Sequence, residues 1–209
     1  MVRKRLFSGD RVLILGAHPD DVEYGMGGTI HKFRKDFDDV TYMVMSSCLE
    51  YPPNRGIDEE LRAAARLMNI QNLLLLDYPW MEFQSVRGKI RQTLFESNKK
   101  LKPDLVFIPS SRDVHQDHEV LSQESFRIFR DVSVIAYEAL RSTLNFTPNL
   151  FVGLRKEDLN AKLHLLRAYK TQRKLFYFNP DIVKSLAVIR GAMSKERFAE
   201  AFEIMRLRI

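Results

Sequence analysis

Short apolar runs alternate with helix-length amphipathic segments along most of this chain. The expected strands are residues 11–17, 40–45, 73–76, 105–108, 132–137 and 149–152. The expected helices are residues 27–36, 57–69, 85–101, a segment ending near 130, and residues 156–169, 180–190 and 194–205. Strands that alternate with helices favour a parallel sheet with right-handed crossovers. We therefore expect an α/β chain built on a mostly parallel sheet.

Length and composition indicate one soluble domain. The chain of 209 residues suits a single α/β domain, and no repeat or linker divides residues 1–209. No apolar run approaches the roughly 20 residues that span a bilayer, and no apolar segment of a signal peptide follows the basic start Met1–Arg5. The single cysteine, Cys48, excludes an internal disulfide and fits a reducing compartment. We expect a cytoplasmic protein without membrane insertion.

The net charge of +6 invites a nucleic-acid hypothesis. The basic residues are spread through helix-like segments, however, and no zinc finger, RNP-type aromatic pattern or recognition helix accompanies them. Solvated lysines and arginines on helix faces explain the charge better. We expect no nucleic-acid partner.

Residues that can bind metal follow the first expected strand directly. The apolar run Val12–Leu15 leads into Gly16–Glu23, in which His18, Asp20, Asp21 and Glu23 lie within six residues. The carboxyl ends of strands in an open α/β sheet are where ligands bind. This loop therefore predicts most of a metal site.

A second loop of the same kind follows the strand 105–108. It carries His115, Asp117 and His118, and the parallel sheet should bring it to the same edge as the first loop. Catalytic zinc takes three His or carboxylate ligands and leaves a position for water, and ligands without thiolate also suit Fe(II), Mn or Co. A spare carboxylate can accept a proton from water, and a spare His can protonate a leaving amine or stabilise an oxyanion. The residue types alone do not separate the role of Asp20 from that of Asp21.

Two other interpretations of these loops are available. His18, Asp20 or Asp21 could instead cap the following helix. The run Gly25-Met26-Gly27-Gly28 suggests a phosphate-binding turn, but its spacing is not G-x-G-x-x-G and acidic residues precede it. We expect these glycines to let the backbone turn closely behind the metal loop.

The motifs Ala17–Glu23, Gly27–Ile30 and His115–His118 together resemble the PIG-L/LmbE family of zinc-dependent de-N-acetylases. The likeness extends to Pro103–Val106 and to a tail with Arg190-Gly191 and Phe198–Glu203. Members act mainly on substrates that contain N-acetylglucosamine. The expected architecture is a Rossmann-like three-layer fold.

The resemblance implies a role for each site residue. His18, Asp21 and His118 would bind Zn²⁺, and Asp20 would be the general base. His115 would act as general acid or oxyanion stabiliser, with Asp117 orienting it. Glu50 and Arg55, in the loop after the second strand, would contact substrate. Glu23 would support the site or the helix N-terminus without binding metal.

The resulting hypothesis is a hydrolase that releases acetate from an N-acetylated amino sugar or sugar conjugate. One alternative is hydrolysis of another amide, such as a thiol-sugar conjugate, at the same centre. Another is a non-catalytic Rossmann-like binding module. The group Phe176-Tyr177-Phe178 fits a homo-oligomer interface or core packing equally well, while His31 and His164 have no expected role.

Overall fold

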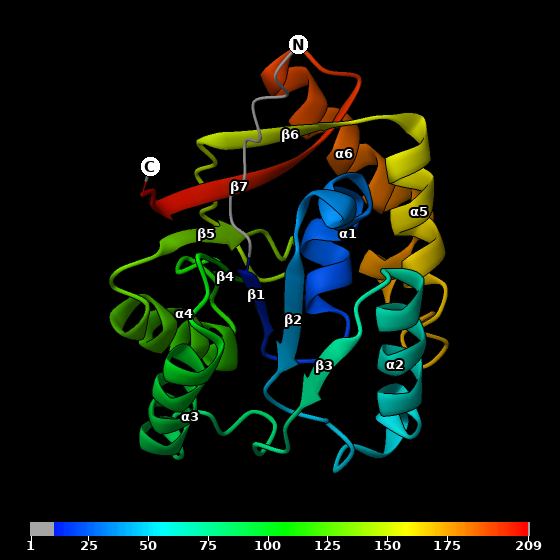
Figure 1. The fold of residues 1–209 in the computed structure, drawn as a ribbon. Coiled ribbons are helices and arrows are strands. Elements are labelled where there is room, and N and C mark those ends of the chain that lie inside the picture. The colour runs from blue at the N-terminus through cyan, green and yellow to red at the C-terminus, as the bar shows by residue number, and fades with distance from the viewer. Residues whose placement is uncertain (1–10, 209) are drawn as a thin grey trace.

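A mixed sheet forms the centre of the molecule (Figure 1). The computed structural model describes residues 11–208, so the basic start Met1–Arg5 lies outside the described part. The strands are β1 (Arg11–Gly16), β2 (Asp39–Val44), β3 (Asn72–Leu75), β4 (Leu105–Pro109), β5 (Ser133–Tyr137), β6 (Leu150–Leu154) and β7 (Phe198–Arg206). Their order across the sheet is β3-β2-β1-β4-β5-β7-β6. Neighbouring strands from β3 to β5 pair in parallel, and β7 pairs antiparallel with both β5 and β6.

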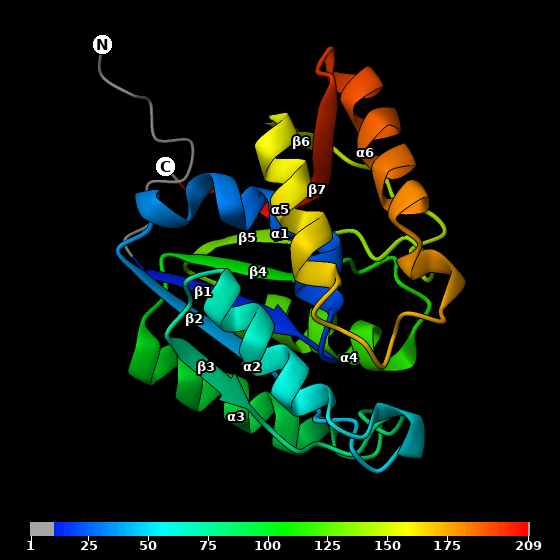
Figure 2. The ribbon, with the colours of Figure 1, turned by 90° about the vertical axis from the view of Figure 1, so that its right-hand side faces the viewer.

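Helices cover both faces of the sheet. They are α1 (Asp21–Phe33), α2 (Ile57–Leu67), α3 (Arg87–Leu101), α4 (Gln116–Ile128), α5 (Lys156–Leu166) and α6 (Pro180–Ser194), and short 3₁₀ helices lie at Arg34–Asp36, Pro52–Asn54 and Phe176–Phe178. Helices α3 and α4 lie on one face, and α1, α2, α5 and α6 pack on the other (Figure 2). The expected three-layer α/β fold with a mostly parallel sheet is confirmed.

The apolar runs form strands because both of their faces are buried. In β1, Val12 and Ile14 belong to the core under α1, α2, α5 and α6, whereas Leu13 and Leu15 belong to the core under α3 and α4. Side chains alternate across a strand, so a central parallel strand needs consecutive apolar residues. This continuous run is what identified the strand in the sequence.

The start of the first helix differs from the expectation. Helix α1 begins at Asp21, so Gly25, Gly27 and Gly28 lie inside it and not in a turn, although the backbone leaves helical geometry at Met26. A Cβ on Gly25 would lie 2.4 Å from a ring carbon of Tyr137, and one on Gly28 would lie 2.7 Å from Leu154. The glycines therefore permit close packing of α1 against neighbouring elements.

The expected helix over residues 194–205 is wrong. Helix α6 ends at Ser194, and the residue that follows it, Lys195, has a φ of 59°. Residues Phe198–Arg206 then form strand β7. Ala, Glu and Met in this tail favour a helix, but insertion between β5 and β6 satisfies the backbone of the tail on both sides. The alternation of large and small residues from Phe198 to Phe202 was the overlooked strand signal.

The aromatic group at residues 176–178 divides between surface and core. Phe176 is 83% exposed, whereas Phe178 is buried in the core. Tyr177 packs edge-on against Tyr24 and lines a cavity at the carboxyl edge of the sheet. Within residues 11–208, no helix has the length and apolar character needed to cross a bilayer.

Candidate active site

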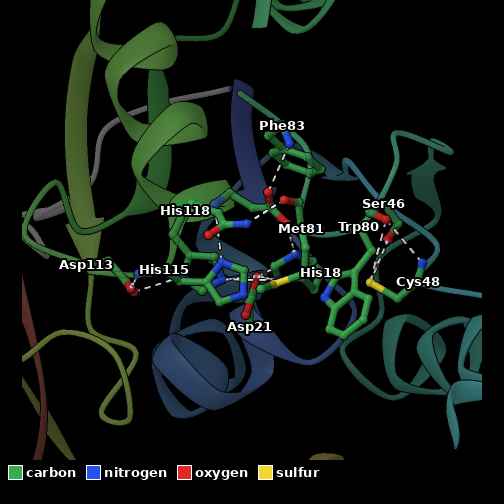
Figure 3. A network of polar contacts seen from close by, with 12 residues as sticks. His18, Asp21, Ser46, Cys48, Trp80, Met81, Phe83, Asp113, His115 and His118 are labelled. Atoms are coloured by element: carbon green, nitrogen blue, oxygen red, sulfur yellow. Dashed lines mark hydrogen bonds and ion pairs between the residues drawn. The ribbon is translucent and has the colours of Figure 1, made fainter. Parts of the chain in front are cut away.

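The two predicted loops meet at the carboxyl ends of adjacent strands. Strands β1 and β4 pair in parallel, and each leads through a short loop into a helix, α1 or α4. The imidazoles of His18 and His118, which are 100 residues apart in sequence, come within hydrogen-bond distance (Figure 3). The sheet therefore brings both loops to one site.

Three ligand atoms form a tight group at this edge. His118 Nε2 lies 3.2 Å from His18 Nδ1 and 3.3 Å from Asp21 Oδ2, and the latter two atoms are 3.7 Å apart. Metal–ligand bonds of about 2.0–2.1 Å place tetrahedral ligands about 3.3–3.4 Å from one another. The spacing of these three atoms fits one tetrahedral cation.

Each of these two imidazoles is held by a carboxylate on its far side. His18 Nε2 lies 2.9 Å from Asp117 Oδ2, and His118 Nδ1 lies 2.8 Å from Asp113 Oδ2. A ring N–H that donates to a carboxylate fixes the tautomer and leaves the other nitrogen as a ligand. Asp117 was expected to orient His115, but the structure pairs its carboxylate with His18.

The hydrogen bonds of the two imidazoles indicate whether a cation fits between them. If His18 donates from Nε2 and His118 donates from Nδ1, then His18 Nδ1 and His118 Nε2 carry no proton. Their lone pairs would then face each other at 3.2 Å, and a cation between them would remove this repulsion. Burial alone would lower the pKa of His118, but the carboxylates of Asp21 and Asp113 outweigh burial and raise this pKa to about 10. The centre therefore attracts positive charge, and the donor set suits a metal ion.

His115 lies beside the same group and is oriented differently. Its ring is 4.8 Å from that of His18 and 4.7 Å from that of His118, centroid to centroid, and the three histidines form a group that could hold a metal. The backbone N–H of Asp117 donates to His115 Nδ1 at the start of α4. Burial and the two other histidines lower the pKa of His115 to about 4. The neutral ring therefore carries its proton on Nε2 and presents a donor.

Asp20 precedes Asp21 and lines the cavity. Its φ of 89° is unusual for a non-glycine residue, and its side chain makes no capping hydrogen bond to α1. Burial, together with the carboxylates of Asp21 and Glu23, raises the pKa of Asp20 well above its ordinary value. Both aspartates line the cavity, but it is the carboxylate of Asp21 that lies against His118 and His18.

A side-chain helix cap is present at His115, at the start of α4, and not at His18 or Asp20. His18 uses its ring for Asp117, and Asp20 makes no side-chain cap. His115 is the residue that accepts a backbone N–H at a helix start. Capping therefore does not account for the first loop.

Glu23 is fully buried behind the loop. Its two carboxylate oxygens accept hydrogen bonds from the hydroxyls of Tyr42 and Tyr169, at 3.0 and 2.9 Å. Burial raises the pKa of Glu23 to about 7, against the effect of these hydrogen bonds. Through these two tyrosines, Glu23 therefore holds the first turn of α1 in place.

A cavity of about 680 Å³ opens over this group. Asp20, Asp21 and the three histidines lie in its wall, but Glu50 and Arg55 do not. The sequence interpretation missed Asp113, although it lies in the second loop, and Arg141, whose guanidinium lies 5.3 Å from the Tyr177 ring centroid. Arg141 follows β5, the next strand of the parallel sheet, and that position is the signal that could have identified it.

Comparisons with known proteins agree with the fold and motifs. YaiS, an uncharacterized deacetylase of Escherichia coli (strain K12), is 25% identical over 172 residues, which cover 77% of this chain and 90% of YaiS. The diacetylchitobiose deacetylase of Thermococcus kodakarensis is 24% identical over 224 residues, covering 93% of this chain and 83% of that protein. The crystal structure of conserved protein TT1542 from Thermus thermophilus superposes with a TM-score of 0.81 at 19% identity, over 95% of this chain and 97% of that one.

The family comparison covers both loops. The model of the PIG-L family, described as GlcNAc-PI de-N-acetylase, matches residues 13–129, which is more than half of the chain. This range contains every acidic and imidazole group assigned to the centre from His18 to His118. The chain therefore belongs to the PIG-L family.

Proposed function

We propose that this protein is a metal-dependent hydrolase that removes the acetyl group from an N-acetylated amino sugar or sugar conjugate of the N-acetylglucosamine type. The observation that carries the proposal is the close group of His18, Asp21 and His118 beside the half-buried Asp20, in the wall of one cavity. Membership of the PIG-L family and deacetylase relatives support an amide hydrolase. The substrate class is taken from those relatives.

His18, Asp21 and His118 would hold the ion. Two imidazoles and one carboxylate without thiolate suit Zn²⁺ best, and Fe²⁺, Mn²⁺ or Co²⁺ are the other candidates. When bound, such an ion supplies Lewis acidity, which makes water a nucleophile near neutral pH and polarises an acyl oxygen. Asp117 and Asp113 keep the two imidazoles in the ligating tautomer.

Asp20 is assigned the proton transfers. Its raised pKa makes it a stronger proton acceptor than an exposed aspartate. It accepts a proton from the attacking water and later returns one to the amide nitrogen, so that the C–N bond breaks to give acetate and an amine. The neutral His115 donates from Nε2 to the acyl oxygen while negative charge develops there.

The test is acetate release together with metal content. Purified protein, expressed with added Zn²⁺, is incubated with a panel of N-acetylated sugars and sugar nucleotides, and acetate and metal per chain are measured. We expect about one ion per chain and acetate from at least one substrate. Amine release without acetate, from a thiol-sugar conjugate for example, would replace the acetyl substrate with another amide. Metal below about 0.1 per chain would instead support the non-catalytic module.

A further inference from the structure

A second cavity is lined by the last turn of α5 and by part of residues 167–180, which lead into α6 (Figure 2). We call it the α5–α6 cavity. Its volume of about 530 Å³ lies within the range of about 300–1,000 Å³ that is usual for small-molecule sites. Within residues 11–208, its lining shares only Leu175 with the cavity over the histidine group. The α5–α6 cavity is therefore a neighbour of the candidate active site and not a part of it.

Apolar side chains make up much of the wall of the α5–α6 cavity. Leu163, Leu166 and Phe178 line it and are otherwise buried in the core. Phe176 also lines it, and its ring is 83% exposed. An exposed phenyl ring beside a concave apolar wall gains free energy when an apolar ligand removes both from water. This wall therefore suits an alkyl chain or another apolar group.

Positive charge accompanies the apolar wall. Arg167, Arg173 and Lys174 line the cavity and are exposed, and no acidic side chain is among its lining residues in the described chain. Residues 159–180 contain five lysines and arginines but no aspartate or glutamate. The guanidinium of Arg173 donates to the carbonyl oxygen of Arg167 at 3.3 Å, which holds this charge at the end of α5. The cavity therefore attracts an anion as well as an apolar group.

We propose that the α5–α6 cavity binds an anionic amphiphile, which is a single molecule with an apolar chain and a negatively charged head. The chain packs against the leucines and phenylalanines of the wall, and the head pairs with Arg173 and Lys174. A concave wall encloses such a molecule better than it fits the flat surface of a bilayer. The site shares no residue with the proposed proton transfers, so its test does not depend on acetate release.

Calorimetric titration with three soluble probes tests the chemistry of the site. Decane-1-sulfonate has both an apolar chain and an anionic head, methanesulfonate has the head alone, and decyltrimethylammonium has the chain with a positive head. All are used on the metal-loaded protein below their micellar concentrations. We expect decane-1-sulfonate to bind at least about tenfold more tightly than either other probe, because only this probe meets both the apolar wall and the cations. Equal affinity for either other probe would overturn the proposal.

Substitutions at exposed positions locate the bound probe. Arg173→Gln and Phe176→Ala should each weaken decane-1-sulfonate binding by about five- to tenfold. Arg141→Gln is the matched control, because Arg141 is an exposed cation that lines the other cavity, and binding should stay within about twofold of the unsubstituted protein. Weaker binding in Arg141→Gln but not in Arg173→Gln would place the probe over the histidine group and overturn the site.

A bilayer is the competing partner for a basic surface with an exposed phenylalanine. Sedimentation with vesicles of phosphatidylglycerol and phosphatidylcholine separates it from a single amphiphile. We expect the protein to remain in the supernatant, with the Arg173→Gln protein behaving in the same way. Sedimentation that Arg173→Gln abolishes, in a protein that does not bind decane-1-sulfonate, would overturn the proposal and assign this surface to an anionic membrane.

Discussion

The two loops of the candidate centre contribute to it in different ways. The loop after β1 supplies groups that line the cavity, namely His18, Asp20 and Asp21. The loop after β4 supplies His115 and His118, and it also supplies the carboxylates that orient the imidazoles of both loops. The first loop thus depends on the second for the direction of His18.

The loops also differ in what holds their backbones. In the first loop Asp20 has a φ of 89°, the His18 N–H donates to Asp21 Oδ2 at 2.8 Å, and the following helix packs closely at Gly25 and Gly28. The second loop is held by hydrogen bonds to Asp113 and Asp117, from His115, Met81 and Phe83 backbone N–H groups. Packing substitutions in α1 should therefore disturb the first loop, whereas the second loop should respond mainly to polar substitutions.

The largest expected effect comes from Asp20→Asn. The amide keeps the size of the side chain but cannot accept the proton from water, so kcat should fall by roughly 10²–10⁴-fold. Metal content should stay at the unsubstituted level, because Asp20 is outside the close group of His18, Asp21 and His118. Acetate release and metal analysis measure the two quantities, and Asp181→Asn, at an exposed position in the first turn of α6, is the control. Unchanged kcat would remove Asp20 from the mechanism.

Gly25→Ala should destabilise the support behind the first loop. Its Cβ would lie 2.4 Å from a ring carbon of the fully buried Tyr137, and overpacking of this kind costs about 1–3 kcal/mol of unfolding free energy. Denaturant unfolding measures the loss. Gly88→Ala in α3 is the matched control, since a Cβ there has nothing within 4 Å, and it should stabilise by about 0.5–1 kcal/mol. Equal effects at both positions would contradict the packing argument.

Most of the sheet could be predicted from the sequence because its strands are buried on both faces. Runs such as Val12–Leu15 then become continuously apolar and are easily recognised. The tail was mistaken for a helix because β7 carries Glu200 and Glu203, which lie buried and paired. Glu200 accepts from Lys162, and Glu203 accepts from Ser110. These partners lie far away in the sequence, so local propensity could not reveal them.

The members of the centre could be predicted, but their pairing could not. Residue types at two strand ends were enough to select the acidic and imidazole groups of both loops, but the choice of Asp21 over Asp20 as a ligand came from the family resemblance. That Asp117 supports His18 and not His115 depends on a contact between residues 99 apart in sequence. Glu50 was expected at the substrate, yet its carboxylate accepts the backbone N–H of Trp80. Such pairings are set by tertiary geometry.

Asp117→Asn tests whether the second loop controls the orientation of His18 in the first. An amide oxygen is a weaker acceptor for the His18 N–H than a carboxylate, and loss of such support typically lowers metal affinity by about 10–100-fold. Chelator competition measures that affinity. Asp113→Asn makes the comparison, and we expect a loss of the same order, because Asp113 holds His118 as Asp117 holds His18 and each also accepts a backbone N–H. Unchanged metal affinity in either variant would remove that carboxylate as a support of the centre.

The smallest effect is expected from Thr143→Val, which removes one support of the second loop while keeping the side-chain shape. The hydroxyl of Thr143 lies 3.2 Å from Asp113 Oδ2, the oxygen that holds His118, and accepts the N–H of Ala139. Losing these bonds should cost about 0.5–1.5 kcal/mol of stability and lower metal affinity by about two- to fivefold. Thr147→Val breaks a similar bond to Glu203, away from the centre. If both variants lose stability but Thr143→Val alone loses metal affinity, then the Thr143 hydroxyl helps Asp113 to orient His118 for metal binding. If Thr143→Val binds metal as tightly as the unsubstituted protein, the contacts of Asp113 with His118 and with the His115 N–H are enough to fix it.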